Sequence, residues 1–220
     1  MERYTEPDLA HAAVLSIDVQ KDFALPGAPF EVPGTAERLP GMAEALEAAR
    51  EAGLPIIHVV RLYKEDASNV DLFRKEAVLR GEGAVLAGSE GACLPEELLP
   101  AVCRPADNRA RPDSELLLSG AFQVLGPEEW ILYKPRFGAF YRTDLEIFLR
   151  ERKIDTLIFM GCNFPNCPRT SIYEASERDF KLVVLRDALS GLYERGEEEL
   201  ARIGVRMKDV ADWKRELAKR

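Results

Sequence analysis

Histidine is scarce in this sequence, and the cysteines are not spaced as metal ligands. Only His11 and His58 are present, and Cys162 and Cys167 do not form a CxxC pair and have no histidine near them. Zinc sites are built from cysteine and histidine ligands at recurring spacings, so we expect no zinc site at these cysteines. A catalytic Cys–His pair is also disfavoured, because His11 precedes the first expected strand and His58 lies inside the second.

Targeting and membrane segments are lacking as well. No apolar run reaches the length of a membrane span, and residues 1–13 are polar and mixed instead of basic and then apolar. We therefore expect a cytoplasmic protein whose four cysteines are free thiols. The formal net charge of -8 argues against binding to nucleic acid or to an anionic membrane surface.

The length and composition favour a single soluble domain over residues 1–220. The 220 residues are 46% hydrophobic and 31% charged, which is typical of a globular protein. Residues 63–127 stand apart as a long insertion rich in glycine, proline and charge, with one helical piece at 70–80. Insertions of this length usually have a function, so we expect a lid or a contact between subunits. Its Cys93 and Cys103 have no partners of catalytic type nearby, and we interpret them as bystanders.

Elsewhere, strand-like apolar runs alternate with segments of helical spacing. The expected strands are 12–19, 54–62, 128–134, 154–161, 181–188 and a short VRM segment. The expected helices are 36–53, 143–153, 168–180, 195–204 and a last helix that closes the chain. Thr143 and Glu146 are spaced as a capping box at the start of the second of these helices. The alternation predicts a mainly parallel sheet with helices on both faces.

Polar residues stand where three of the predicted strands end. Asp18 follows the first strand, Lys134 ends the third, and Cys167 comes just after the fourth. Ligand sites in parallel sheets lie beyond the carboxyl ends of the strands, so these residues can converge there. Singly, each has an ordinary alternative: a loop cap for Asp18, a lysine reaching solvent for Lys134, and an inert buried thiol for Cys167. Their shared position favours a joint function.

The chemistry of the three side chains fits nucleophilic catalysis. A thiolate is a far better nucleophile than a thiol, and its pKa falls at a helix N-terminus and beside a cation. Cys167 stands at a predicted helix start and Lys134 would supply the cation, so we expect a lowered pKa for this thiol. Asp18 could take the thiol proton and later pass it to a leaving amine.

These residues and their surroundings resemble the cysteine hydrolase branch of the isochorismatase-like superfamily. The matching segments are LSIDVQKDF (15–23), YKPRFGAFYRTDLEIFLR (133–150), the loop from Gly161 to Cys167 with its helix, and VVLRDALSG (183–191). The resemblance implies an α/β fold with three αβα layers and a mainly parallel six-stranded sheet in the order 3-2-1-4-5-6.

The resemblance also implies a reaction and a role for each residue. Asp18 would shuttle a proton, Lys134 would give electrostatic support, and Cys167 would be the nucleophile. Members of this branch cleave C–N bonds of small amides, ureido acids or carbamoyl compounds through a thioacyl enzyme, which water then hydrolyses. Family members commonly form homodimers or homotetramers, and we expect the same here, with a small molecule as substrate.

The loop before Cys167 is implied to bind the substrate oxyanion. A cis peptide bond is expected between Cys162 and Asn163, and the backbone N–H groups of Asn163 and Cys167 would form the oxyanion hole. This loop reads G-C-N-F-P-N-C, whereas many amidases of the branch read G-V-A-T-N-V-C. The difference predicts a different pocket wall, so the substrates of common members are a weak guide.

A bound metal or cofactor is not expected. The nicotinamidase branch of the superfamily binds a metal through an Asp-x-His motif and a further histidine. This sequence has no Asp-x-His motif, and Asp66 stands in the segment KEDAS.

Further substrate contacts are predicted around the three site residues. Phe23 follows the first strand, and Arg136 and Phe137 follow the third. Arg136 could hold a substrate carboxylate or make a surface salt bridge. Phe164 could cover the bound group or pack under the helix, and Tyr141 could line the pocket or an interface.

Two other functions stay open at this point. One is a true isochorismatase, which cleaves a vinyl ether; those enzymes resemble the chain around RFGAF and Gln20 but generally lack a cysteine at position 167. The other is a catalytically silent binding or partner subunit on the same fold, against which the intact set of Asp18, Lys134 and Cys167 argues.

Overall fold

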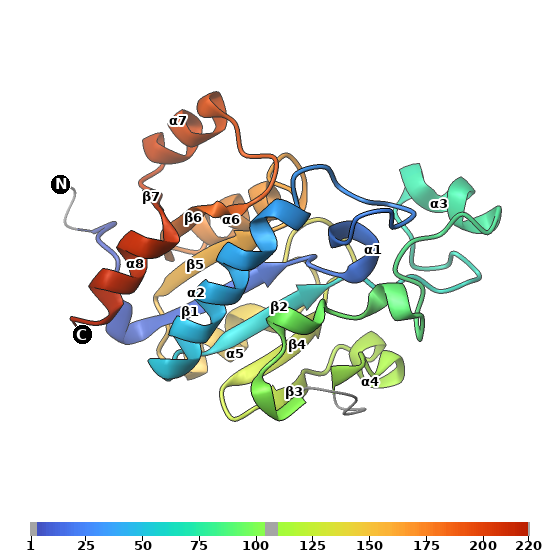
Figure 1. Cartoon of the computed structure of the whole chain (residues 1–220), viewed down its shortest axis with the longest axis horizontal. Helices are drawn as coiled ribbons and strands as arrows, with labels where there is room; N and C mark the ends of the chain where they lie inside the picture. The colour runs from blue at the N-terminus through green and yellow to red at the C-terminus, as the bar shows by residue number, and fades with distance from the viewer. Residues whose placement is uncertain (1–3, 104–109, 220) are drawn as a thin grey trace.

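A mostly parallel sheet runs through the part of the chain that the structure describes. The computed structural model describes residues 4–103 and 110–219, and its seven strands lie in the order β3-β4-β2-β1-β5-β6-β7 (Figure 1). All neighbours pair in parallel except β3 and β4, which are antiparallel. The strands are β1 (Ala12–Ile17), β2 (Ile56–Val60), β3 (Gln123–Gly126), β4 (Glu129–Tyr133), β5 (Thr156–Gly161), β6 (Lys181–Leu189) and β7 (Arg206–Lys208).

The sequence predicts six of these strands, and their predicted order is confirmed. The predicted order 3-2-1-4-5-6 corresponds to β4, β2, β1, β5, β6 and β7. The sequence does not predict β3, which adds an antiparallel edge at the end of the insertion. Its four residues, QVLG, are alternately buried and partly or fully exposed, and so short a pattern does not stand out from the surrounding turns.

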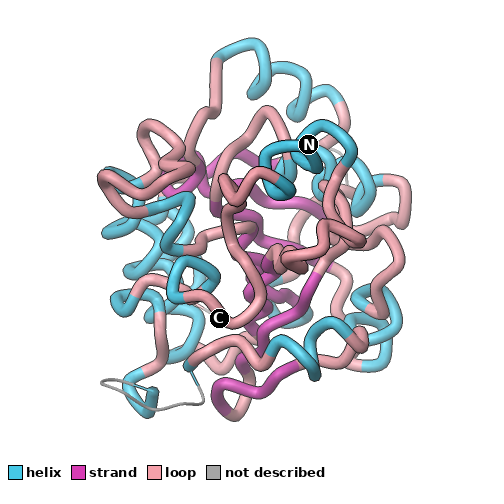
Figure 2. Tube along the Cα trace, turned by 90° about the vertical axis from the view of Figure 1, so that its right-hand side faces the viewer, coloured by secondary structure: helices cyan, strands magenta, loops and turns pink. Residues whose placement is uncertain are grey.

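Helices cover both faces of the sheet, so the predicted three-layer αβα architecture is confirmed (Figure 2). One face packs against α2 and α8, and the other packs against α5, α6 and α7. Successive side chains of a strand point to opposite faces, so β1 supplies residues to both hydrophobic layers. The α-helices are α1 (Lys21–Ala24), α2 (Leu39–Glu51), α3 (Leu72–Leu79), α4 (Ser114–Leu118), α5 (Leu145–Glu151), α6 (Cys167–Ser176), α7 (Glu194–Arg202) and α8 (Val210–Leu217). Short 3₁₀ turns are Leu9–His11, Ala36–Arg38, Glu90–Ala92, Glu96–Leu98 and Ala101–Cys103.

The start of α5 differs from the predicted capping box. Asp144, not Thr143, occupies the N-cap position and makes no side-chain cap hydrogen bond. The Thr143 hydroxyl donates to the Ala139 carbonyl oxygen at 2.6 Å, and Glu146 accepts from Arg178 at 3.1 Å. Glu146 is therefore used to hold a neighbouring segment, whereas Thr143 also accepts the Leu145 N–H at the helix start in a long contact of 3.5 Å.

The insertion packs against the carboxyl ends of β1 and β2, on the right of Figure 1. A hydrophobic cluster of its own joins it to the ends of β2 and β4. Backbone contacts add to this: the Val85 N–H donates to the Asp22 carboxylate at 2.6 Å, and the Lys21 N–H donates to the Cys93 carbonyl oxygen at 2.8 Å. Residues 104–109 of the insertion lie outside the described residues. No helix within 4–103 or 110–219 has the length and apolar character needed to cross a membrane.

A buried charge cluster ties α2, β2 and β4 together. Glu129 is 3% exposed; its carboxylate accepts from Arg50 Nη2 at 2.8 Å and lies 2.7 Å from His58 Nε2. Burial by itself raises the pKa of the Glu129 carboxyl, but the hydrogen bonds from Arg50 and His58 outweigh burial and hold the pKa at about 2. His58 therefore has a structural role.

Gly161 lets β1 and β5 approach each other at their carboxyl ends. Its φ is +131°, and a Cβ atom there would lie 2.3 Å from the Ile17 carbonyl oxygen. That oxygen accepts the Cys162 N–H at 2.9 Å, so it cannot move without breaking a contact beside the Cys167 loop. Only glycine fits both the backbone angle and the space.

We predict that Gly161→Ala lowers the free energy of unfolding by at least about 3 kcal/mol, because it adds backbone strain to a clash with fixed backbone atoms. Gly53→Ala is the matched control: Gly53 has φ of +65° and no atom within 4 Å of the added Cβ. Its cost should be about 1 kcal/mol, from the left-handed backbone alone. Urea unfolding of both variants would contradict the prediction if the two costs were equal.

We also predict that Glu129→Gln flattens the acid dependence of stability. The folded pKa of Glu129 lies below its ordinary value of 4.5, so its charge stabilises the native state above that value. This contribution is lost as the pH falls from about 4.5 towards 2. Urea unfolding should give a variant that is less stable at neutral pH but loses less stability on acidification. Glu44→Gln, an exposed change on α2, is the control, and parallel curves for Glu129→Gln and the wild type would refute the prediction.

Candidate active site

Asp18, Lys134 and Cys167 are brought together at the carboxyl edge of the sheet. Asp18 follows β1, and its N–H donates to the Val59 carbonyl oxygen of β2 at 2.8 Å. Lys134 follows β4, and its N–H donates to the Val60 carbonyl oxygen at 3.0 Å. These two bonds to β2 fix the positions of Asp18 and Lys134 along the strand direction. Strand β2 lies between β1 and β4, the strands that these residues follow.

Asp18 and Lys134 form a buried ion pair. Lys134 Nζ donates to Asp18 Oδ2 at 2.8 Å, and the two residues are 0% and 4% exposed. Asp18 Oδ1 is buried and accepts no hydrogen bond from any described residue. Asp18 also has φ of +54°, a conformation that is uncommon outside glycine and often marks a functional position. The arrangement holds one carboxylate oxygen and leaves the other able to accept a proton.

Helix α6 begins at Cys167 itself and is fastened to the loop that follows β4. Ser171 Oγ donates to the Cys167 carbonyl oxygen at 2.7 Å and accepts the Ala139 N–H at 3.0 Å. One turn further on, Glu174 accepts the Phe140 N–H at 2.9 Å. These bonds set the position of the thiol relative to the loop that carries Lys134.

The loop between β5 and α6 contains two backbone N–H groups that have no backbone acceptor among the described residues. The peptide bond between Cys162 and Asn163 is cis, and the Phe164 N–H donates to the Ser190 carbonyl oxygen at 2.8 Å. Within the described residues, neither the Asn163 N–H nor the Cys167 N–H donates to a backbone carbonyl. Both groups can therefore donate to an acceptor from outside the described residues, and their role as an oxyanion hole stays a prediction.

The predicted lowering of the Cys167 pKa is wrong for this structure. Burial raises the pKa of the thiol, and the negative charge of Asp18 raises it further. The positive charges of Lys134 and Arg61 act in the opposite direction but are weaker, and the pKa is about 11. Cys167 is 6% exposed, so the loss of solvation outweighs the helix-start position on which the expectation rests. At neutral pH the thiol therefore keeps its proton until a base removes it.

Phe23 and Phe137 lie beside arginines that surround this edge of the sheet. The guanidinium carbon of Arg74 is 5.6 Å from the centre of the Phe23 ring, and that of Arg61 is 5.7 Å from the centre of the Phe137 ring. Phe23 is buried and Phe137 is partly buried. Both positions are compatible with the predicted contacts.

Arg136 lies at the rim, with its guanidinium directed at the backbone. Its Nη1 donates to the carbonyl oxygens of Asn69 at 3.1 Å and Pro135 at 2.6 Å, and its side chain is 46% exposed. Its Nε is 3.9 Å from Asp71 Oδ1, the distance of a weak ion pair. The salt-bridge alternative for Arg136 is the one that these contacts favour.

Phe164 is not placed as a substrate contact, and Tyr141 lies on the surface, where its predicted role in the pocket or an interface stays a prediction. Phe164 is 0% exposed, belongs to the main hydrophobic cluster and packs edge-on against Tyr193 with 5.4 Å between ring centres. It therefore packs under the helices instead of covering a ligand. Tyr141 is exposed and has the Arg142 guanidinium 5.3 Å from its ring centre, which places it on the surface.

Arg61 is a charged residue at this edge that the sequence analysis does not identify. It directly follows β2, is 1% exposed and donates from Nη2 to Asp71 Oδ2 at 2.5 Å. Gln20 fixes its backbone from both sides: the Arg61 N–H donates to Gln20 Oε1, and Gln20 Nε2 donates to the Arg61 carbonyl oxygen, each at 2.8 Å. The sequence signal that identifies it is a charged residue, an arginine, inside the apolar run 54–62.

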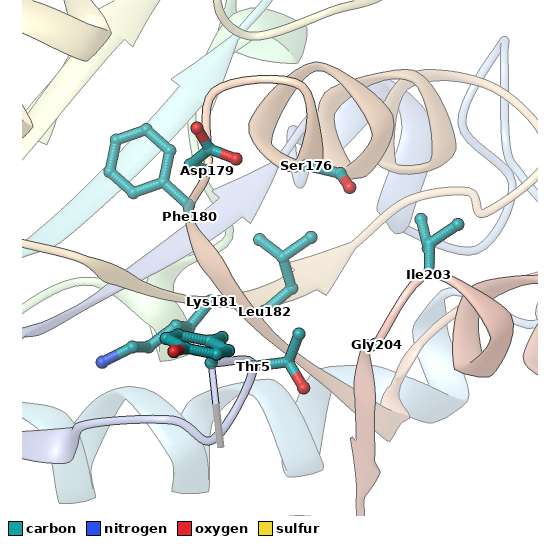
Figure 3. Close-up of a pocket in the computed structure, with 9 residues that line it drawn as sticks. Thr5, Ser176, Asp179, Phe180, Lys181, Leu182, Ile203 and Gly204 are labelled. Carbon is teal, nitrogen blue, oxygen red and sulfur yellow. The ribbon is translucent and has the colours of Figure 1, made fainter. Parts of the chain in front are cut away.

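The hollow drawn in Figure 3 lies away from the candidate active site. Figure 3 shows a surface hollow at the amino end of β6, the opposite end of the sheet, and none of the predicted site residues lines it. No group of three or more potential metal ligands occurs among residues 4–103 and 110–219.

Comparison with known proteins identifies the family. The pattern of the isochorismatase domain matches residues 12–214. The crystal structure of an isochorismatase family protein from Desulfovibrio vulgaris is similar with a TM-score of 0.78 and 31% sequence identity, over 94% of this chain and 98% of that chain. This chain belongs to the isochorismatase-like hydrolase family.

Two relatives of the chain differ in activity. A probable inactive nicotinamidase of Arabidopsis thaliana is 27% identical over 94% of this chain and 97% of its own length. An N-carbamoylsarcosine amidase of an Arthrobacter species is 30% identical over 80% of this chain and 58% of its own length. Membership of the family therefore leaves the activity to be argued from the site.

We predict that Asp18→Asn shifts the alkylation of Cys167 to lower pH. The charge of Asp18 raises the pKa of the thiol, so its removal lowers that pKa. Iodoacetamide reacts with the thiolate, and peptide mass spectrometry follows Cys167 separately from the other thiols. Asp212→Asn, an exposed change on α8, is the control. If the pH midpoint of Cys167 alkylation is unchanged or higher in Asp18→Asn, Asp18 does not raise the pKa of the thiol.

Proposed function

We propose that this protein is a cysteine hydrolase that cleaves the C–N bond of a small amide, ureido or carbamoyl compound. The observation that carries the proposal is the placement of the Cys167 thiol at the start of α6 beside Asp18, whose one oxygen is held by Lys134 while the other has no partner among the described residues. The low exposure of all three residues favours a small substrate.

In the first half of the reaction, the sulfur of Cys167 attacks the carbonyl carbon of the substrate as Asp18 takes the thiol proton. The raised pKa of the thiol supports a need for this base at neutral pH. The negative oxygen of the tetrahedral intermediate accepts hydrogen bonds from the N–H groups of Asn163 and Cys167, each worth about 3 kcal/mol. Asp18 then protonates the nitrogen, the C–N bond breaks, and ammonia or an amine leaves a thioacyl enzyme.

In the second half, water attacks the thioester carbon. Asp18 takes a proton from this water, and the same two N–H groups stabilise the new oxyanion. The C–S bond then breaks, the sulfur recovers its proton from Asp18, and the acid product leaves. Lys134 stabilises the Asp18 carboxylate between these steps.

The two alternatives are less well supported. Vinyl ether cleavage needs no thiol, and Gln20, which the chain shares with isochorismatases, is occupied by the backbone of Arg61 and of Ala92. A buried charge pair beside a thiol costs stability unless it is used, which favours a catalytic role over a silent protein. The silent alternative is matched by one relative, a probable inactive nicotinamidase.

We predict ammonia release from at least one class in a panel of small amides, ureido acids and carbamoyl compounds. Cys167→Ala should reduce the rate by at least about a thousandfold, because it removes the nucleophile. Acid quenching during turnover should give a mass adduct of the acyl group on Cys167 in the wild type. Cys93→Ala, a buried thiol in the insertion, is the control for loss of a cysteine.

Three results would count against the proposal. Equal amide hydrolysis by Cys167→Ala would exclude the thiol mechanism. Cleavage of a vinyl ether without ammonia release from the panel would favour the isochorismatase alternative. Ligand binding with no turnover and no adduct would favour the silent alternative.

A further inference from the structure

Arg61 has more hydrogen-bond donors than partners. Its side chain is 1% exposed, and Nη2 donates to Asp71 Oδ2 at 2.5 Å. Nε and Nη1 are buried and have no acceptor among the described residues. Unpaired donors of a buried cation are rare in folded proteins, because neither water nor another group replaces their solvation. The guanidinium can therefore bind an acceptor that the described residues do not supply.

The guanidinium also lies near the candidate active site. The two bonds to Gln20 fix its backbone, and its carbon lies 5.7 Å from the centre of the Phe137 ring on the loop after Lys134. Its charge lowers the pKa of the Cys167 thiol, so it is close enough for a direct electrostatic effect. A ligand that reaches the thiol therefore passes within range of Arg61.

Local charge around Arg61 favours an anion, although the chain as a whole has a net charge of -8. Asp71 accepts from both Arg61 and the Tyr63 hydroxyl, and it is also the partner of Arg136 at 3.9 Å. One carboxylate thus serves two guanidinium groups. Arg74 adds a third, because its Nη1 donates to the Tyr63 hydroxyl at 3.2 Å. The surplus of positive charge is suited to receive a carboxylate.

We propose that Arg61 binds a carboxylate of the substrate, which limits the substrates to small acids that carry an amide, ureido or carbamoyl group. This proposal rests on the function proposed above. Asp71 holds Nη2, and Nε or Nη1 donates to a carboxylate oxygen of the substrate while the scissile carbonyl lies at Cys167. Arg61 contacts the part of the substrate that does not react, so it determines binding more than the rate of the chemical step.

The test compares an N-carbamoyl amino acid with its methyl ester, by ammonia release, in the wild type, Arg61→Met and Arg61→Lys. For the acid, Arg61→Met should raise KM about 10- to 100-fold with a smaller change in kcat, and Arg61→Lys should lie between it and the wild type. For the ester, KM should change less than about threefold. Arg152→Met, at the end of α5 that leads into the amino end of β5, controls for the loss of one positive charge.

A binding experiment separates this proposal from the proposed function. Succinate and acetate contain no C–N bond, and they should raise the Tm of the wild type and of Cys167→Ala but not that of Arg61→Met. This result in a protein without amidase activity would refute the hydrolase function and leave the carboxylate site in place. Three results would each overturn the role of Arg61. The first is an equal rise in KM for the acid and the ester in Arg61→Met, and the second is a larger rise in KM for the acid in Arg136→Met than in Arg61→Met. The third is a wild-type Tm that succinate and acetate fail to raise. Arg61→Lys keeps the charge and serves if Arg61→Met does not fold.

Discussion

The buried contact between Lys134 Nζ and Asp18 Oδ2 is the interaction on which the candidate site depends. It joins the ends of β1 and β4 across the intervening β2, and both charged groups are almost fully removed from solvent. Removing either partner would leave the other charge buried and unpaired, which costs several kcal/mol. The pair therefore aligns the strand ends and places a carboxylate next to a thiol. Its free oxygen is where we place the proton transfer.

The insertion is part of the site as much as the sheet is. The ends of the strands provide the thiol, the carboxylate and the ammonium group. The insertion provides Asp71, which accepts from Arg61, Tyr63, which donates to Asp71, and Ala92, which accepts from Gln20. We propose a division in which the αβα frame carries the reaction and the insertion selects the substrate. Such a division allows the substrate to change through the insertion without disturbing the chemistry.

The sequence predicts the strands and the residues that end them well, but it predicts the pKa values and the pairing of buried charged groups poorly. Buried parallel strands are continuous apolar runs, so the residues that end them can be identified, and Asp18, Lys134 and Cys167 were found in this way. The pKa of Cys167 was predicted in the wrong direction, because its burial results from packing between segments far apart in the chain. Arg61 was missed for the same reason: its apolar run is visible, but the buried state of its guanidinium depends on Asp71 and Gln20. The assignment of residues 1–220 to a single domain and the contacts between subunits stay predictions.

The sequence by itself determined the alternation of strands and helices, the order of the sheet and the three residues at its carboxyl edge. The alternation and the three residues follow from local periodicity and from the rule that parallel strands place their ends together, whereas the order of the sheet is implied by the resemblance to a known family. Only the tertiary structure decided that Phe164 packs inside, that Arg136 lies at the rim and that Arg61 is buried with unused donors. The physical reason is that solvation and pairing of a charged group depend on every segment that packs around it, and most of those segments are distant in the sequence.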